Sequence, residues 1–239
     1  MKFDVLTLFP EMIAAYLQQG VLGRAIKRGL VDINLVNIRD FATGSHKITD
    51  DRPYGGGEGM IMKAGPIYRA VKSVERSDGK SPVILLSPQG KRFDQSVAWE
   101  MSGWDQLILI CGRYEGVDER IRVTSIDLEL SVGDYILSGG ELGAMVVIDA
   151  VSRLIPGVLG SERSNLEDSF EKGLLKYPQY TRPRRFQDIE VPEVLLSGNH
   201  EKIRVWRRRE SLRRTFDKRP DLLKQAKLTA EDRAILTEF

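Results

Sequence analysis

The sequence predicts an α/β protein with a mostly parallel sheet, followed by a small all-helical C-terminal domain, and three observations lead to this prediction. The first 150 residues alternate short apolar runs with amphipathic stretches, which is typical of strands covered by helices on both faces. After residues 155–157 the chain becomes polar and rich in proline, and then helical in pattern. A length of 239 residues, 41% of them hydrophobic, is enough for one large and one small domain.

Five apolar runs predict the strands of the sheet. They are rich in Val, Ile and Leu and nearly continuous in apolarity, as in strands buried on both faces, and they cover residues 3–8, 33–37, 83–87, 107–111 and 126–130. The stretches between them predict helices over residues 11–28 with a break near Gly20, 65–76, 94–101, 118–123 and 141–154. The glycine-rich residues 43–62 predict a loop.

The C-terminal part predicts a linker and then helices. Residues 160–170 are small and polar, as in a linker. Helical spacing runs from Asn199 to near Pro220, and two short helices over residues 221–226 and 229–238 follow, the second with a capping box of Thr229 and Asp232. We therefore expect a domain over residues 1–160, an interdomain linker over 161–172 and a helical domain over 173–239.

The net charge of +2 is the average of two unlike parts, since residues 1–160 carry −2 and residues 161–239 carry +4. Nine basic residues lie between Lys202 and Arg219 against only Glu210 and Asp217, too unbalanced for pairing along the helix to neutralise them. A solvated charged face is the usual explanation of such a run. We favour phosphate contact and predict an RNA-binding surface of Arg207, Arg208, Arg209, Arg213 and Arg214.

Several classes of protein are disfavoured by composition. One cysteine, Cys111, allows no internal disulfide framework, and two histidines far apart in sequence give no zinc site, so no metal ligand is predicted. No apolar run of about eighteen residues predicts a membrane helix. The N-terminus does not resemble a signal peptide, so a cytoplasmic protein without membrane contact is expected.

Three glycine-containing loops follow three of the predicted strands, at residues 86–90, 111–116 and 131–140. In parallel sheets, ligands bind beyond the carboxyl ends of the strands. A single such loop is best explained as an ordinary turn, whereas three together favour a binding site. Neither a P-loop nor a dinucleotide fingerprint is present. The side chains of Leu86, Tyr114, Tyr135 and Leu137 would instead suit an uncharged aromatic group such as adenine.

These loops and further motifs resemble the bacterial tRNA (guanine-N1)-methyltransferases. The matching segments run nearly from end to end: LFPE at 8–11, DDRPYGGG at 50–57, LSPQG at 86–90, CGRYEG at 111–116, GDY at 133–135, LSGGEL at 137–142, SRLIPGVLG at 152–160, EDSF at 167–170, YTRP at 180–183 and VLLSGNH at 194–200. The family commonly has proline where this chain has Glu58 and Gly143. Neither departure removes a reacting group.

The resemblance implies an S-adenosylmethionine-dependent enzyme of the SPOUT superfamily, whose α/β domain ties a trefoil knot in its C-terminal part, against the general rule that chains do not knot. It also implies a homodimer with the active site at the subunit interface. The substrate would be the anticodon arm of tRNA, methylated at N1 of the guanine at position 37. By the same resemblance, the cofactor would contact Leu86, Ser87, Pro88, Gln89, Gly112, Tyr114, Glu115, Gly116, Val132, Gly133, Asp134, Tyr135, Ile136, Leu137, Gly139 and Gly140.

The resemblance also assigns catalytic residues. Guanine N1 carries a proton at neutral pH, and Asp168 matches the family's catalytic aspartate that would remove it. Arg153 matches the catalytic arginine and would donate to guanine O6, while Glu115 would hold the guanine edge or the positive end of the cofactor. By their surroundings alone, Asp168 would be a solvated or helix-capping residue and Arg153 a surface residue. Family members use magnesium, which these residues neither support nor exclude.

Other interpretations differ in the function or in the role of single residues. The chain could be a non-catalytic RNA-binding protein, or a methyltransferase that acts on ribose or on another base. Asp50, Asp51 and Arg52 would either brace the glycine turn or contact tRNA or a partner subunit. Among the remaining residues, Cys111 is expected to be a buried thiol, His200 to cap or pack near a helix start, and Trp206 and Phe216 to anchor the core of the small domain.

Overall fold

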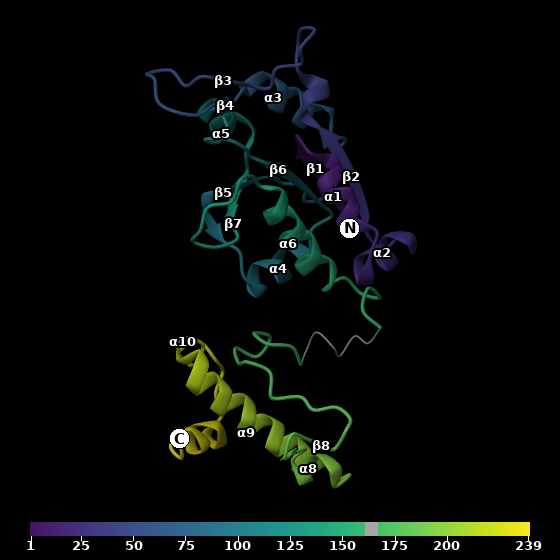
Figure 1. The fold of residues 1–239 in the computed structure, drawn as a ribbon, viewed down its shortest axis with the longest axis vertical. Coiled ribbons are helices and arrows are strands. Elements are labelled where there is room, and N and C mark those ends of the chain that lie inside the picture. The colour runs from purple at the N-terminus through teal and green to yellow at the C-terminus, as the bar shows by residue number, and fades with distance from the viewer. Residues whose placement is uncertain (161–166) are drawn as a thin grey trace. The chain divides into compact units, whose positions relative to one another are not determined.

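The computed structural model describes residues 1–160 and 167–239 of the chain. The chain divides into two compact units, Met1–Gly160 and Ser161–Phe239 (Figure 1). The first unit contains the large sheet and the second contains a long helix, and each is described by itself below.

Five strands form one parallel sheet in the first unit: β1 (Lys2–Thr7), β2 (Asp32–Asn37), β5 (Val83–Arg92), β6 (Gln106–Cys111) and β7 (Leu128–Ser131). Their order across the sheet is β2-β1-β6-β5-β7, and every neighbouring pair is parallel. All five apolar runs are therefore strands, and the α/β prediction with a parallel sheet is confirmed.

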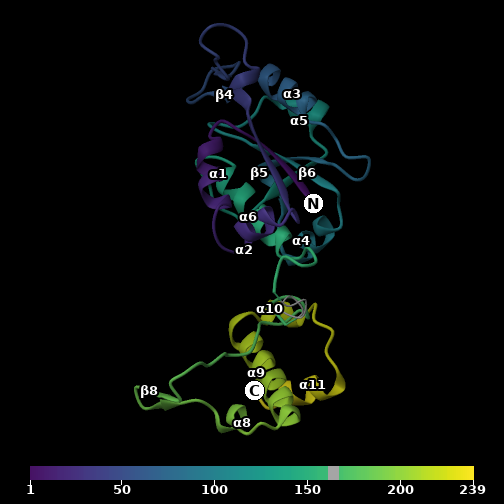
Figure 2. The ribbon, with the colours of Figure 1, turned by 90° about the vertical axis from the view of Figure 1, so that its right-hand side faces the viewer.

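Helices cover both faces of this sheet (Figure 2). One face packs against α1 (Pro10–Leu17), α2 (Gly20–Lys27), α4 (Gln95–Ser102) and α6 (Glu141–Ser152), and the other against η1 (Ile38–Phe41), α3 (Ala64–Ser73) and α5 (Glu119–Ser125). Along β6, Leu107 and Leu109 face the first group, whereas Ile108 and Ile110 face the second. This two-sided burial explains why the strand sequences are apolar throughout rather than alternating.

Residues 43–62 contain more structure than the expected loop. β3 (Asp50–Asp51) and β4 (Ile61–Met62) pair antiparallel and form a short hairpin. Asp51 pairs with Lys63 at 3.0 Å rather than with the side chain of Arg52, and this bond lowers the pKa of Asp51. The prediction of a plain loop was wrong here because strands of two residues leave no periodic pattern in a sequence.

The second unit is built around the long helix α9 (His200–Lys218), with the shorter helices α8 (Glu193–Leu196), α10 (Pro220–Leu223) and α11 (Ala230–Leu236). The expectation of an all-helical unit needs one correction, because β8 (Arg185–Phe186) and β9 (Ile189–Glu190) form a two-stranded hairpin. The capping box of Thr229 and Asp232 is confirmed at the start of α11. Asn199 caps α9 through its side chain, and His200 is the first helical residue.

The aromatic residues of the second unit are less buried than expected. Trp206 is half-buried, with its ring centroid 6.4 Å from that of Tyr180. Phe216 is 43% exposed and packs against Phe239, so the prediction that Phe216 anchors a core was wrong. Leu212, one turn before Phe216 on α9, is fully buried instead. Among the residues described, no helix is long and apolar enough to cross a membrane.

Candidate active site

The first glycine loop bulges out of β5. This strand pairs with β7 up to Leu86, which lies opposite Leu130, and resumes with Lys91 opposite the same Leu130. The intervening residues 87–90 leave the ladder, and the backbone N–H of Gln89 donates to Ser87 Oγ at 3.2 Å. A Cβ atom at Gly90 would lie 2.4 Å from the backbone of β7, so only glycine lets the chain return this closely.

The second and third loops meet the first at Gly140. The backbone N–H of Gly140 donates to the carbonyl of Gly112 at 2.9 Å, and Arg113 and Gly139 form an antiparallel bridge beside it. A Cβ atom at Gly140 would lie 2.8 Å from Cys111 Cα and 3.1 Å from Leu86 Cβ. Loops from three separate strands therefore touch where a side chain would keep them apart.

A buried carboxylate fixes this arrangement. Glu141 opens α6, is 1% exposed, and accepts hydrogen bonds from Thr7 Oγ1 at 2.7 Å and from Arg113 Nε at 3.0 Å. The Arg113 guanidinium also lies over the ring of Phe9, 4.4 Å from its centroid. A charge this deeply buried is tolerated because it is paired on both oxygens. The expected buried thiol is also present, since Cys111 is fully buried and burial raises its pKa.

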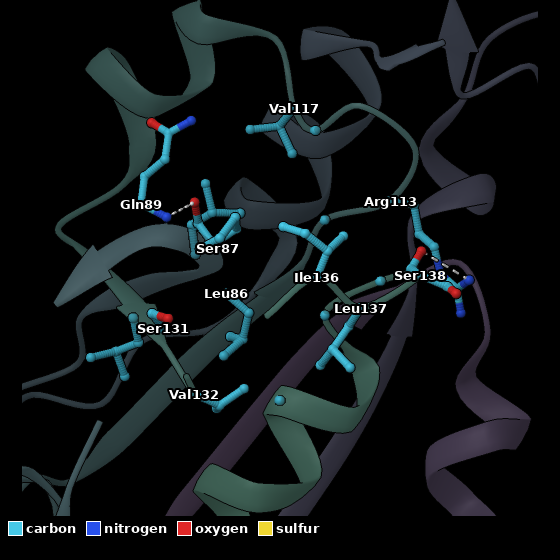
Figure 3. Close-up of a pocket in the computed structure, with 18 of the residues that line it drawn as sticks. Leu86, Ser87, Gln89, Arg113, Val117, Ser131, Val132, Ile136, Leu137 and Ser138 are labelled. Carbon is cyan, nitrogen blue, oxygen red and sulfur yellow. Dashed lines mark hydrogen bonds between the residues drawn. The ribbon is translucent and has the colours of Figure 1, made fainter. Parts of the chain in front are cut away.

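The three loops enclose a cavity of about 250 Å³ (Figure 3). All the residues proposed to contact the cofactor line it, with the single exception of the exposed Asp134. Eight further residues line the cavity without having been predicted, and most lie next to predicted ones along the same strands and loops: Leu85, Arg113, Val117, Arg122, Leu130, Ser131, Ser138 and Gly143.

The cavity presents apolar side chains, one acid and two arginines that are already paired with glutamates. Leu86, Ile136 and Leu137 face it (Figure 3), and Ile136 is 83% exposed, a large apolar surface for a bound ring to cover. Tyr114 adopts a φ of 59°, a left-handed conformation that is rare for a bulky residue and concentrates at functional sites. The exposed carboxylate of Glu115 lines the same cavity. An uncharged aromatic ring with a positive charge nearby therefore fits these residues.

The predicted catalytic residues do not all gather at the cavity. Glu115 lines it, whereas Arg153 follows the last residue of α6, about 18 Å along the helix from Glu141 at 1.5 Å per residue. Asp168 belongs to the second unit, where its Oδ1 accepts from Lys176 Nζ at 3.0 Å. Within residues 1–160 and 167–239, no group of three or more His, Cys, Asp or Glu residues could hold a metal ion.

Three of the five selected arginines of α9 already have acidic partners. Arg208 donates two hydrogen bonds to Asp232, at 2.8 and 2.7 Å, and holds the pKa of this carboxyl at about 2. Arg209 pairs with Glu238 and Arg213 with Glu210. Asp232 and Glu238 lie outside the basic run between Lys202 and Arg219, so the balance of charges within that run did not include them. Arg214 has no ion pair in the described part of the chain, and Arg207 lies over the ring of Tyr177.

The parallel sheet, with a cavity beyond the carboxyl ends of its strands, has the arrangement of α/β proteins that bind a ligand at this edge of the sheet. Comparison with known protein families identifies the family to which the chain belongs. The family described as tRNA (Guanine-1)-methyltransferase TrmD matches residues 1–225, and the chain belongs to this family.

Relatives match over the whole chain. The tRNA (guanine-N(1)-)-methyltransferases of Pelotomaculum thermopropionicum and Moorella thermoacetica are each 55% identical over 241 residues, which is 100% of this chain and 96% of the relative. The protein of the same name from Geobacillus kaustophilus is 53% identical over 239 residues, which is 100% of this chain and 98% of the relative. The resemblance drawn from the motifs is therefore confirmed, and a methyltransferase family implies S-adenosylmethionine as cofactor.

Proposed function

We propose that this protein transfers a methyl group from S-adenosylmethionine to N1 of the guanine at position 37 of tRNA, in the cytoplasm where tRNA is modified. The observation that carries the proposal is the cavity of three glycine loops, which suits an adenine ring, in a chain of the tRNA (guanine-N1)-methyltransferase family. Membership of this family also favours a guanine base over ribose as acceptor and an enzyme over a simple RNA-binding protein.

The cofactor supplies a methyl group bonded to a positively charged sulfur. The apolar side chains of Leu86, Ile136 and Leu137 would cover its adenine ring, while the carboxylate of Glu115 would attract the positive charge or hold the guanine edge. The proposal assigns no residue to a metal, and magnesium stays a prediction of the resemblance.

Asp168 acts as the base in this proposal. Its carboxylate accepts the proton of guanine N1, so that the nitrogen lone pair can bond to the methyl carbon while the bond from that carbon to the cofactor's sulfur breaks and S-adenosylhomocysteine leaves. Negative charge then accumulates on guanine O6, and the guanidinium of Arg153 donates hydrogen bonds to that oxygen. Asp168 would thus remove the proton, and Arg153 would stabilise the negative charge.

A second copy of the chain would bring these groups together. Arg153 and the cavity lie at opposite ends of α6, so an arginine from another subunit can reach a cavity that its own arginine cannot. Apolar surface for such a contact is supplied by the exposed side chains of Met12 and Tyr16 from α1, of Phe9 just before it, and of Leu142 and Val146 from α6. We therefore propose a homodimer with shared active sites.

The second unit would bind the anticodon arm. Arg207 and Arg214 lie seven residues apart on α9, hence on one face, and neither has a carboxylate partner among the described residues. Phosphate groups are the ligands that such free guanidinium groups favour.

Replacement of Asp168 tests the proposal. Asp168→Asn should lower the rate of methyl transfer to unmodified tRNA by about 100-fold or more, because the amide cannot accept the proton. The measurement uses labelled cofactor, and nuclease digestion with mass spectrometry identifies the modified base. Cofactor binding by calorimetry should stay unchanged. Asp78→Asn, at an exposed aspartate of the first unit, is the matched control. Near-wild-type turnover of Asp168→Asn, or a product other than N1-methylguanine, would contradict the proposal.

A further inference from the structure

Two short segments of the second unit are bound side by side around Asp168. The ammonium of Lys176 donates to Asp168 Oδ1 at 3.0 Å, and the backbone N–H of the same lysine donates to Ser169 Oγ at 3.0 Å. Burial raises the pKa of Tyr177, which keeps its proton and donates to Glu167 Oε2 at 3.2 Å. Three consecutive residues, 167–169, are thus each held by Lys176 or Tyr177.

The holding segment is itself attached to α9. The backbone N–H of Leu175 donates to Thr215 Oγ1 at 2.9 Å, and Thr215 is fully buried. The hydroxyl of Thr215 donates in turn to the carbonyl of Ser211 at 2.6 Å. The guanidinium of Arg207, also on α9, lies 4.8 Å from the centroid of the Tyr177 ring. The Asp168 carboxylate is therefore fixed relative to the longest helix of its unit.

We propose that Lys176 is a positioning residue for Asp168, and this inference rests on the proposed function of Asp168 as base. An aspartate on a segment without regular structure can rotate about both of its side-chain bonds. The ion pair with Lys176 restricts that rotation and fixes the direction in which the carboxylate faces. Because both side chains are partly exposed, at 24% and 36%, the pair adds little to stability, so its main effect is orientation.

The test separates orientation from binding. Lys176→Met keeps a side chain of similar length but cannot donate to Asp168. We expect the single-turnover rate at saturating tRNA and cofactor to fall by about tenfold or more, since misplaced catalytic groups cost factors of this order. The affinities for tRNA and for S-adenosylmethionine should stay unchanged. Lys176→Arg restores a donor and should recover most of the rate.

A matched control removes a positive charge nearby without touching Asp168. Lys172 is exposed on the same segment and has no ion pair in the described part of the chain. Lys172→Met should therefore keep the wild-type rate. An equal loss in Lys172→Met, or a loss in Lys176→Met that appears only as weaker tRNA binding, would overturn the positioning role. If Lys176→Met does not fold, Lys176→Leu takes its place in the same comparison, since a leucine side chain likewise cannot donate to Asp168.

Failure of this inference differs from failure of the proposed function. A wild-type rate in Lys176→Met together with an inactive Asp168→Asn would support Asp168 as the base and contradict the positioning role of Lys176. An active Asp168→Asn would remove the base itself.

Discussion

Gly140 is the residue at which the three loops of the candidate site meet, and it is tightly constrained. Its φ of −78° is open to any residue, so the need for glycine is steric rather than conformational. The backbone of Cys111 and the side chain of Leu86 occupy the space that a Cβ atom would need. Any side chain here would push the bulge of β5 and the loop after β6 apart.

We therefore predict that Gly140→Ala loses affinity for S-adenosylmethionine by about tenfold or more, because overpacking costs about 1–3 kcal/mol and the cavity walls must move to relieve it. Calorimetry measures the affinity, and thermal unfolding shows whether the unit stays folded. Gly160→Ala is the control, since a Cβ atom there meets nothing within 4 Å. Equal affinity in the two variants would contradict a steric role for Gly140.

Some residues of the site were accessible from sequence and others were not. Glycine content and position after an apolar strand mark Gly112 and Gly140 without any structure, because both signals are local. The contact between Lys176 and Asp168 leaves no such mark. It depends on how a segment without regular structure folds back on itself, and an ordinary lysine carries no sign of its partner.

At the scale of elements, the basic residues of α9 have two different environments: some form ion pairs within the second unit and others do not. Arg208 is bound to Asp232 in the capping box of α11, so it connects two helices. Arg214 makes no such bond among the residues described. The two arginines belong to the same run in the sequence, yet their environments differ.

Their replacement should separate the two roles. Arg214→Ala should lower by about one the slope of log affinity for tRNA against log salt concentration, with no change in stability, because one phosphate contact is lost. Arg208→Ala should destabilise the second unit by about 1–3 kcal/mol, because the buried carboxylate of Asp232 loses its charged partner and keeps only the bond from the Thr229 backbone. Filter binding over a salt series and urea unfolding measure the two effects. An unchanged slope for Arg214→Ala would show that this arginine does not contact a phosphate group of tRNA.

Elements with long-range periodicity were predictable, and those without it were not. The five strands and α9 follow from runs of apolar or helically spaced residues. The β3–β4 and β8–β9 hairpins have strands of two residues, too short for any pattern. The knot implied by the resemblance stays a prediction, because apolar runs say where strands lie and not how the chain is threaded between them.

For the molecule as a whole, the proposed dimer makes a prediction about mixtures. In Gly140→Ala the cavity is defective and Asp168 is intact, whereas Asp168→Asn has the reverse combination. If each active site joins a cavity from one subunit to Asp168 of the other, a heterodimer of the two variants regains one complete site. At a cofactor concentration below the dissociation constant of Gly140→Ala, coexpression should then restore methyl transfer well above either variant alone.

Differently tagged copies of Asp168→Asn, coexpressed and purified in the same way, give the matched control and should stay inactive. Light scattering checks that the mixed species is a dimer. A heterodimer no more active than its parents under these conditions would show that each chain completes its own site, and would contradict the shared arrangement.

The bulge in β5 has a further consequence for how the pocket can change in evolution. Since Leu86 and Lys91 pair with the same residue of β7, the bulge begins and ends at one point of the ladder. Insertions or deletions between them alter the length of the loop without shifting the register of the strand. Descendants of this protein can therefore remodel one wall of the pocket while inheriting the sheet intact.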